Sequence, residues 1–145
     1  MAPASGPVPQ GNYVPAKRFG GLVFVSGMTP RENGVLTAMG KIVEGEPVER
    51  YRPAVELATR NALLAAQAVL AGGEVLAEAI SLTVYLNAAP EFTAHSRVAD
   101  FASAVLADAL GSIPSRAAVG VNSLPGGATV EISLVAGISA ADLPR

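Results

Sequence analysis

The alternation of apolar and polar positions along the chain predicts two helices and five strands in a single domain. Apolar residues recur at helical spacing over 53–71, and again in a second helix that we expect to begin at 89–91 and end at Gly111. The order ββαβαββ predicts an α+β fold with one mixed sheet and both helices on one of its faces. Two-residue alternation marks the strands at 13–19, 22–26, 79–86, 116–123 and 129–138.

The rest of the chain is organised around this domain. Residues 1–10 are rich in proline and predict a flexible N-terminal tail, followed by a single domain over 11–145. Residues 29–50 contain several glycines and predict a long loop with one short strand near 41–43.

The face of the sheet away from the helices also carries apolar residues. We expect Val23, Val25, Val119 and Val121 to lie there, and the mean hydropathy of +0.41 is high for a chain of this size. Apolar surface of this extent usually marks an interface, so identical copies in a closed ring are expected to cover it.

Arg116 and Glu131 are lone charges inside apolar strand-like runs. A charge in such a run is tolerated when it faces water or is paired. The loop 124–128 predicts a hairpin, and pairing Ser123 with Thr129 would set Arg116 and Glu131 about five residues, or roughly 16 Å, apart along the strands. This offset favours a pocket shared between two subunits, and the alternative is two unrelated surface charges.

Composition excludes several kinds of chemistry. The chain has no cysteine and a single histidine, His95, which we expect to be a solvated helix residue. We therefore expect no metal site and no thiol nucleophile. The net charge of −2 and pI of about 5.3 do not favour a nucleic-acid partner. No long apolar run or signal peptide is evident, which favours a cytoplasmic protein that does not span a membrane.

Several segments of the sequence resemble the Rid/YjgF family of reactive-intermediate enamine/imine deaminases. The most specific segment joins Pro-x-Arg at 114–116 to Leu-Pro at 124–125 and Val-Glu at 130–131, and further likeness lies in 11–27 and 83–92. The second-helix segment 92–100 is similar to a less characterised branch of this family. The resemblance implies a trimeric, chorismate-mutase-like fold with pockets between subunits.

The same resemblance implies roles for individual residues. Arg116 falls on the family's carboxylate-binding arginine and Glu131 on its water-handling glutamate, while Tyr13 and Ser26 fall on pocket positions. Two further positions depart from the family pattern. They are Ala118, where a cysteine is frequent, and Ser96, where an asparagine stands on the second helix.

The activity implied is hydrolysis of a small carboxylate-bearing enamine or imine with release of ammonia. Arginine suits the carboxylate because its guanidinium is planar and bidentate, and a glutamate can orient water and move protons. This chemistry requires no metal and no organic cofactor. The departures at Ala118 and Ser96 leave open a non-catalytic trimer that binds small carboxylates or assists a pathway. An endoribonuclease is a third alternative, which the acidic composition disfavours.

Overall fold

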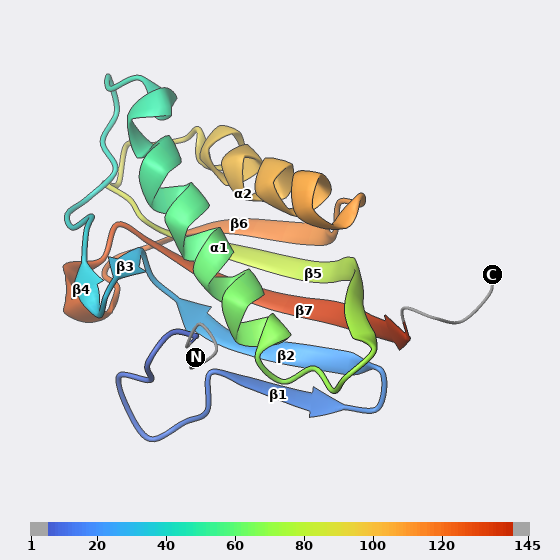
Figure 1. The fold of residues 1–145 in the computed structure, drawn as a ribbon. Helices are drawn as coiled ribbons and strands as arrows, with labels where there is room; N and C mark the ends of the chain where they lie inside the picture. The colour runs from blue at the N-terminus through green and yellow to red at the C-terminus, as the bar shows by residue number, and fades with distance from the viewer. Residues whose placement is uncertain (1–5, 141–145) are drawn as a thin grey trace.

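The computed structural model describes residues 6–140, which form one five-stranded sheet in the order β1-β2-β7-β5-β6 (Figure 1). Strands β5 and β6 are parallel, and the other neighbours are antiparallel. A separate small hairpin pairs β3 with β4. The strands are β1 (Ala16–Phe19), β2 (Leu22–Met28), β3 (Arg31–Glu32), β4 (Val35–Leu36), β5 (Glu74–Asn87), β6 (Ser115–Val121) and β7 (Val130–Ala140).

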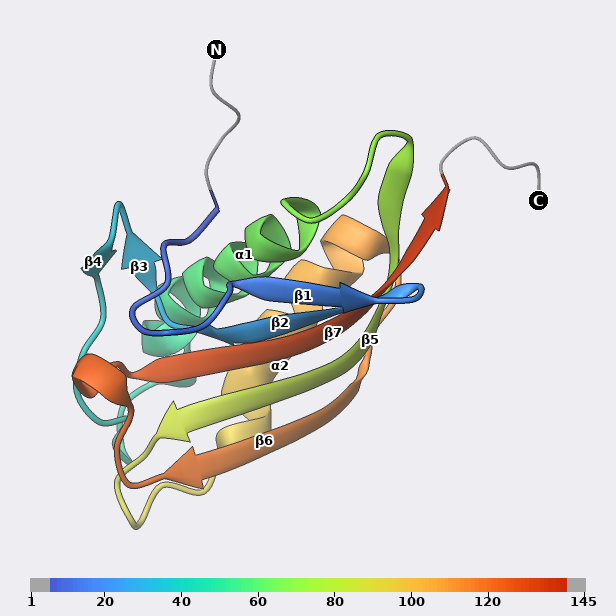
Figure 2. The ribbon, with the colours of Figure 1, turned by 90° about the horizontal axis from the view of Figure 1, so that it is seen from below.

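Both α-helices cover the same face of the sheet and leave the other face open (Figure 2). They are α1 (Arg52–Gln67) and α2 (His95–Leu110), and two short 3-10 segments, η1 (Val48–Tyr51) and η2 (Pro125–Gly127), lie in the loops. The core fills the space between the helices and the sheet. The predicted α+β architecture, with two helices on one face of a mixed sheet, is confirmed and matches the chorismate-mutase-like fold. No helix within residues 6–140 has the length and apolar character needed to cross a bilayer.

The helices differ from their predicted limits at one end each. Helix α1 ends at Gln67 rather than near residue 71, and a turn leads to Gly73, whose φ is +82°. Helix α2 begins at His95 rather than at 89–91. The backbone N–H of Ala89 donates to the carbonyl of Ile42, and this bond holds the segment after β5 against its neighbour. Helix α2 can therefore begin only after this segment has left the sheet.

The predicted hairpin between the last two strands is wrong. Strand β6 pairs with β5 in parallel after the α2 crossover, and β7 lies between β2 and β5. The connection contains Gly126 and Gly127, both with positive φ, and leads to a bridge between Ala128 and Met39. The glycines do form a turn, but a turn signal is local and does not specify which strands pair.

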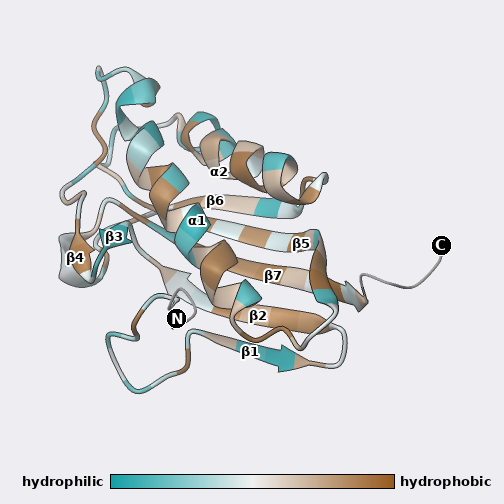
Figure 3. Cartoon of the chain, viewed as in Figure 1, coloured by the Kyte–Doolittle hydropathy of each residue, from teal (hydrophilic) through white to brown (hydrophobic). Residues whose placement is uncertain are grey.

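The prediction for the open face is wrong for two of its four residues. Val23 and Val25 are buried beneath the helices, along the apolar stretch of β2 seen in Figure 3. Their neighbours Leu22 and Phe24 face the open side and are 38% and 46% exposed. Alternation predicts two faces for a strand but does not say which face the helices will cover. Pleating places Val119 and Val121 on the open face, as expected.

A polar junction that the sequence analysis did not identify fixes the loops at one end of the sheet. The side chain of Asn87, at the end of β5, is buried and donates from Nδ2 to the carbonyl of Ala128 at 3.1 Å. Its Oδ1 accepts from Lys41 Nζ at 3.0 Å, and the same Nζ donates to the carbonyl of Asn122 at 2.5 Å. These bonds hold the connection between β6 and β7 against the end of β5.

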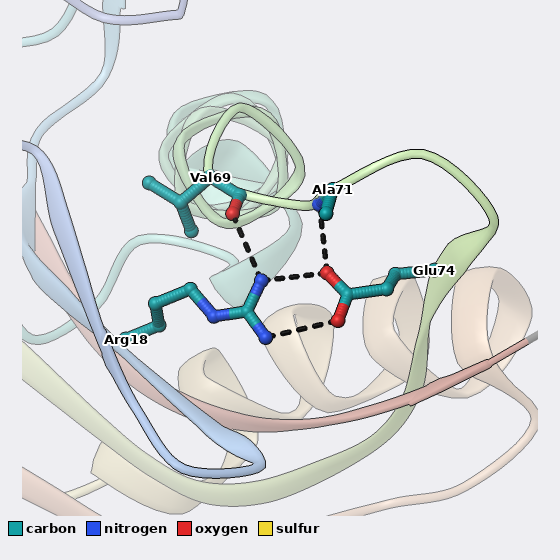
Figure 4. Close-up of polar contacts among 4 residues, drawn as sticks. All are labelled: Arg18, Val69, Ala71 and Glu74. Atoms are coloured by element: carbon teal, nitrogen blue, oxygen red, sulfur yellow. Dashed lines mark hydrogen bonds and ion pairs between the residues drawn. The ribbon is translucent and has the colours of Figure 1, made fainter.

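An ion pair joins strand β1 to the first residue of β5, next to the connection from α1 (Figure 4). Arg18 donates from Nη1 and Nη2 to the two oxygens of Glu74, at 2.6 and 2.9 Å, and Nη1 also donates to the carbonyl of Val69. The Ala71 backbone N–H donates to the same carboxylate at 2.7 Å. The hydrogen bond from Arg18, followed by that from Ala71, lowers the pKa of Glu74 to about 2.

This pKa predicts how acid will affect the fold. A carboxylate whose pKa is depressed in the folded state stabilises the fold above its unfolded pKa, about 4.5, and loses that contribution as pH falls toward about 2. Glu74→Gln is expected to lower Tm at pH 7, and the difference from wild type should shrink between pH 4.5 and 2. Melting curves followed by circular dichroism measure it, with Glu46→Gln, from the exposed pair with Arg50, as control. A difference that stays constant across this range would contradict the prediction.

Candidate functional site

Helix α2 holds the side chain of Arg116 at the outer edge of the sheet. Arg116 lies on β6 opposite Leu82 of β5, and its side chain points to the helix-covered face. Its Nη1 donates to Asp100 Oδ1 at 2.8 Å and to Ser103 Oγ at 3.0 Å, and its Nη2 donates to Ser96 Oγ at 2.7 Å. The three acceptors lie on one face of α2 because they follow helical spacing. The guanidinium is therefore oriented before any ligand arrives.

An open cavity of about 590 Å³ lies where Arg116 meets the N-terminal end of α2. On the strand side, β6 contributes Arg116, Val119 and two small residues, Ala118 and Gly120. On the helix side the lining residues carry hydroxyl and imidazole groups, and no side chain caps the start of α2. The cavity is lined by Thr93, His95, Ser96, Arg116, Ala118, Val119 and Gly120.

The two positions that depart from the family pattern both line this cavity. The Ser96 hydroxyl contacts Arg116 directly, so the serine provides a hydrogen-bond acceptor for the guanidinium. Ala118 lies between Arg116 and Gly120 on the same face of β6 and leaves room for a ligand.

Glu131 lies on the other face of the sheet. It is on β7 opposite Tyr85, where its side chain is half-buried. Burial raises the pKa of the Glu131 carboxyl. The carboxyl group packs on Gly27, where an added Cβ would lie 2.7 Å from Glu131 Cδ and would collide with Oε2. A larger residue at position 27 would force the Glu131 carboxylate to move from this position.

The hydroxyls of the other two predicted site residues bond to their own chain. Ser26 Oγ donates to the carbonyl of Val14 at 2.6 Å. Tyr13 OH accepts from the backbone N–H of Gln10 at 3.0 Å, and the Tyr13 side chain is 45% exposed. Ser26 bonds to Val14, the residue after Tyr13, and Gly27, the residue after Ser26, packs on Glu131. Tyr13 and Ser26 therefore lie near the same end of β2 as Glu131.

A single chain does not bring the four predicted site residues together. Glu131 on β7 and Arg116 on β6 are separated by β5, about 10 Å across two strand spacings, and by about 10 Å more along the strands. They also point to opposite faces. The sequence analysis placed the two residues far apart on the basis of a hairpin between β6 and β7, which is wrong. They are separated because β5 lies between these strands and because their side chains point to opposite faces of the sheet.

His95 is a cavity residue that the sequence analysis did not select. It was expected to be solvated, but it is half-buried and lines the same cavity as Arg116. Its ring lies 5.2 Å from the ring of Phe92, centroid to centroid. In the structure, Gly120 of β6 lies against the His95 ring. This contact depends on the tertiary fold, so the sequence, which shows only a histidine before Ser96, does not reveal it. Within the described part of the chain no group of three or more metal-ligating side chains is found.

Comparison with known proteins places these features in one family. The sequence model described as Endoribonuclease L-PSP matches residues 4–138. Protein TCP17 of Trypanosoma cruzi is 30% identical over 86% of this chain and 79% of its own length. A structure of a protein of unknown function from Agrobacterium tumefaciens is 34% identical, with a TM-score of 0.82, and the match covers 94% of this chain and 87% of that one. RidA from a Psychrobacter species is 26% identical, with a TM-score of 0.63 and coverage of 91% and 93%.

Proposed function

We propose that this chain, which belongs to the endoribonuclease L-PSP (Rid/YjgF) family, hydrolyses small carboxylate-bearing imines and releases ammonia. The observation that carries the proposal is the position of Arg116. Its guanidinium lines an open cavity and is held by Ser96 and Asp100. Nη1 and Nη2 already donate to acceptors on α2, so a ligand carboxylate bonds to the Nε–H or takes the place of one of these acceptors.

The reaction can be assigned to these groups step by step. An enamine takes a proton on its β-carbon and becomes the imine. Water adds to the imine carbon, the C–N bond breaks, and the products are a carbonyl compound and ammonia. Arg116 holds the substrate carboxylate, while Glu131 takes the proton from water and returns it to the departing nitrogen. The raised pKa of Glu131 supports this role, because a proton-transfer group works best with a pKa near the working pH.

Assembly joins the two halves of this site. Arg116 and Glu131 lie on opposite faces of one subunit, so a site that uses both takes one residue from each of two subunits. The open face is apolar enough for contact with a second copy: Phe19, Leu22 and Phe24 are 83%, 38% and 46% exposed. Exposed apolar groups of this kind favour an interface.

A trimer, the assembly that the family resemblance implies, is the expected form in solution. Sedimentation at micromolar concentration should give about three times the subunit mass of 14.6 kDa. Phe24→Glu, which places a charge on the open face without touching the core beneath the helices, should shift the protein toward monomer. A wild-type monomer under these conditions would contradict the shared site.

Ammonia release tests the activity itself. The enamine 2-aminoacrylate is generated enzymatically, and release of ammonia is followed with and without this protein. The proposal expects a faster release. No acceleration with any enamine tested, together with normal carboxylate binding, would instead favour a non-catalytic carboxylate-binding trimer.

One observation favours that second function: the hydroxyls of Tyr13 and Ser26 already bond to their own chain. The acidic composition disfavours ribonuclease activity.

A further inference from the structure

We propose that His95 contacts the ligand held by Arg116 and selects carboxylates that carry a second polar group at their far end. The inference rests on the proposed function to the extent that it takes Arg116 as the carboxylate anchor. It adds a specificity-determining residue and defines the substrate class more narrowly. The ligands are carboxylates with a second carboxylate, an amide or a hydroxyl, and the substrates are the corresponding imines.

The first argument is position. His95 is the first residue of α2, and the next residue, Ser96, accepts a hydrogen bond from Arg116. Both His95 and Arg116 line the same cavity. A ligand bound at the guanidinium therefore lies in the space that the imidazole also faces.

The second argument is the way in which the imidazole is held. Its ring packs beside the ring of Phe92, tilted by 58°. On the other side it packs on Gly120, where an added Cβ would lie 2.6 Å from Nε2 and 3.3 Å from Cδ2. Glycine at position 120 is therefore needed for the ring to lie where it does.

The third argument concerns hydrogen bonds. No hydrogen bond to either imidazole nitrogen of His95 is found within residues 6–140, and the Nε2 edge of the ring lies against Gly120. The ring is thus positioned by packing, and Nδ1 is the nitrogen that lies farther from Gly120 and remains available to a ligand. A neutral imidazole carries one donor and one acceptor, so it can bond to a carboxylate, an amide or a hydroxyl.

The fourth argument is the shape of the cavity along β6. Arg116, Ala118 and Gly120 lie on the same face of the strand, and the Cα atoms of the first and last are about 13 Å apart. The arginine starts from one end of this stretch and the imidazole packs on the other, and Ala118 lies between them on the strand; Thr93, Ser96 and Val119 also line the cavity. A ligand lying along this strand presents its carboxylate to Arg116 and its far end to His95.

Binding of matched ligands to the full-length protein tests the proposal. Isothermal titration compares butyrate with succinate and succinamate, which have the same chain length and differ in the terminal group. Wild type should bind succinate and succinamate about 5- to 10-fold more tightly than butyrate, the range for one net hydrogen bond. His95→Ala should remove this preference and leave butyrate affinity unchanged. His95→Gln should restore part of it, because an amide can still donate and accept.

Two further variants separate the imidazole from other causes. Gly120→Ala keeps the histidine but displaces its ring, so it should also reduce the preference for succinate and succinamate over butyrate. Arg97→Ala removes an exposed cation from the same helix and should leave the preference intact. A preference that depended on Arg97 would overturn the role of His95.

The outcomes distinguish this inference from the proposed function. If wild type binds all three ligands equally, or if His95→Ala keeps the wild-type preference, the role of His95 is wrong while Arg116 remains the anchor. If wild type binds none of the three carboxylates, the anchor itself is wrong, and both the proposed function and this inference are overturned.

Discussion

Arg116→Ala is expected to abolish detectable binding of small carboxylates while leaving the fold and the assembly intact. Hydrogen bonds to charged groups contribute about 1.5–3 kcal/mol each, so loss of even one bond from the guanidinium should weaken binding by at least about 10- to 100-fold. The fold should survive because the partner that loses its cation, Asp100, has a side chain that is 66% exposed and stays hydrated. Titration with a small carboxylate measures the loss, and sedimentation reports assembly.

Two companion variants make this result specific. Arg116→Lys should recover little binding, because an ammonium lacks the planar fork that Ser96 and Asp100 now orient. Arg60→Ala removes the same charge from the exposed surface of α1 and should bind carboxylates as wild type does. Normal binding by Arg116→Ala would show that the carboxylate site lies elsewhere.

Glu131→Gln is expected to lower the rate of ammonia release by about 10²- to 10⁴-fold, the usual contribution of a general acid–base group. Carboxylate binding should persist because Arg116 is unchanged. The subunit should remain folded because burial disfavours the charged form of Glu131, and a neutral amide avoids that cost. Glu44→Gln, on an exposed loop, is the matched control and should keep the wild-type rate.

The pH dependence provides an independent check on Glu131. A base must be deprotonated to accept the proton of water, so the rate should fall as pH drops through the raised pKa of Glu131. This acid limb should therefore lie above the ordinary glutamate value of 4.5, and it should be absent in Glu131→Gln.

A structural role for Glu131 would give a different pattern. If the carboxylate only pairs with a cation across an interface, Glu131→Gln should weaken the trimer. Removing one partner of a buried pair costs roughly 3–5 kcal/mol. Sedimentation and ammonia release on the same variant therefore separate the two roles.

Local patterns predicted most of the fold, because the helices and strands follow short-range periodicity. The small apolar residues of α1, such as Ala58 and Ala62, are fully buried where the helical stripe placed them. The pairing of β6 and β7 was not predictable in this way. The turn at Gly126 looks the same whether the strands beside it pair or are separated by a third strand. Asn87 was missed for a similar reason, because its partners Lys41 and Ala128 are distant in the sequence.

In the candidate site, too, local sequence patterns identified some residues, while their spatial arrangement depended on distant contacts. Arg116 and Glu131 could be selected from sequence because a charge in an apolar run is conspicuous. Their placement on opposite faces follows from the register of each with β5, which no local pattern specifies. His95 could not be selected because its environment depends on Gly120, a residue on a different element.

The central position of β7 determines when the sheet can form as the chain is synthesised. Before β7 exists, the β1–β2 hairpin and the β5–β6 pair share no backbone ladder, since β7 is the strand that pairs with both. Leu22 pairs with Gly137, so this step joins residues from nearly opposite ends of the chain. Such distant pairings form slowly because a long loop must close first. During translation, the β1–β2 and β5–β6 strands are therefore made before they can pair into one sheet. The sheet is completed only when β7, the last strand to be synthesised, pairs with both β2 and β5.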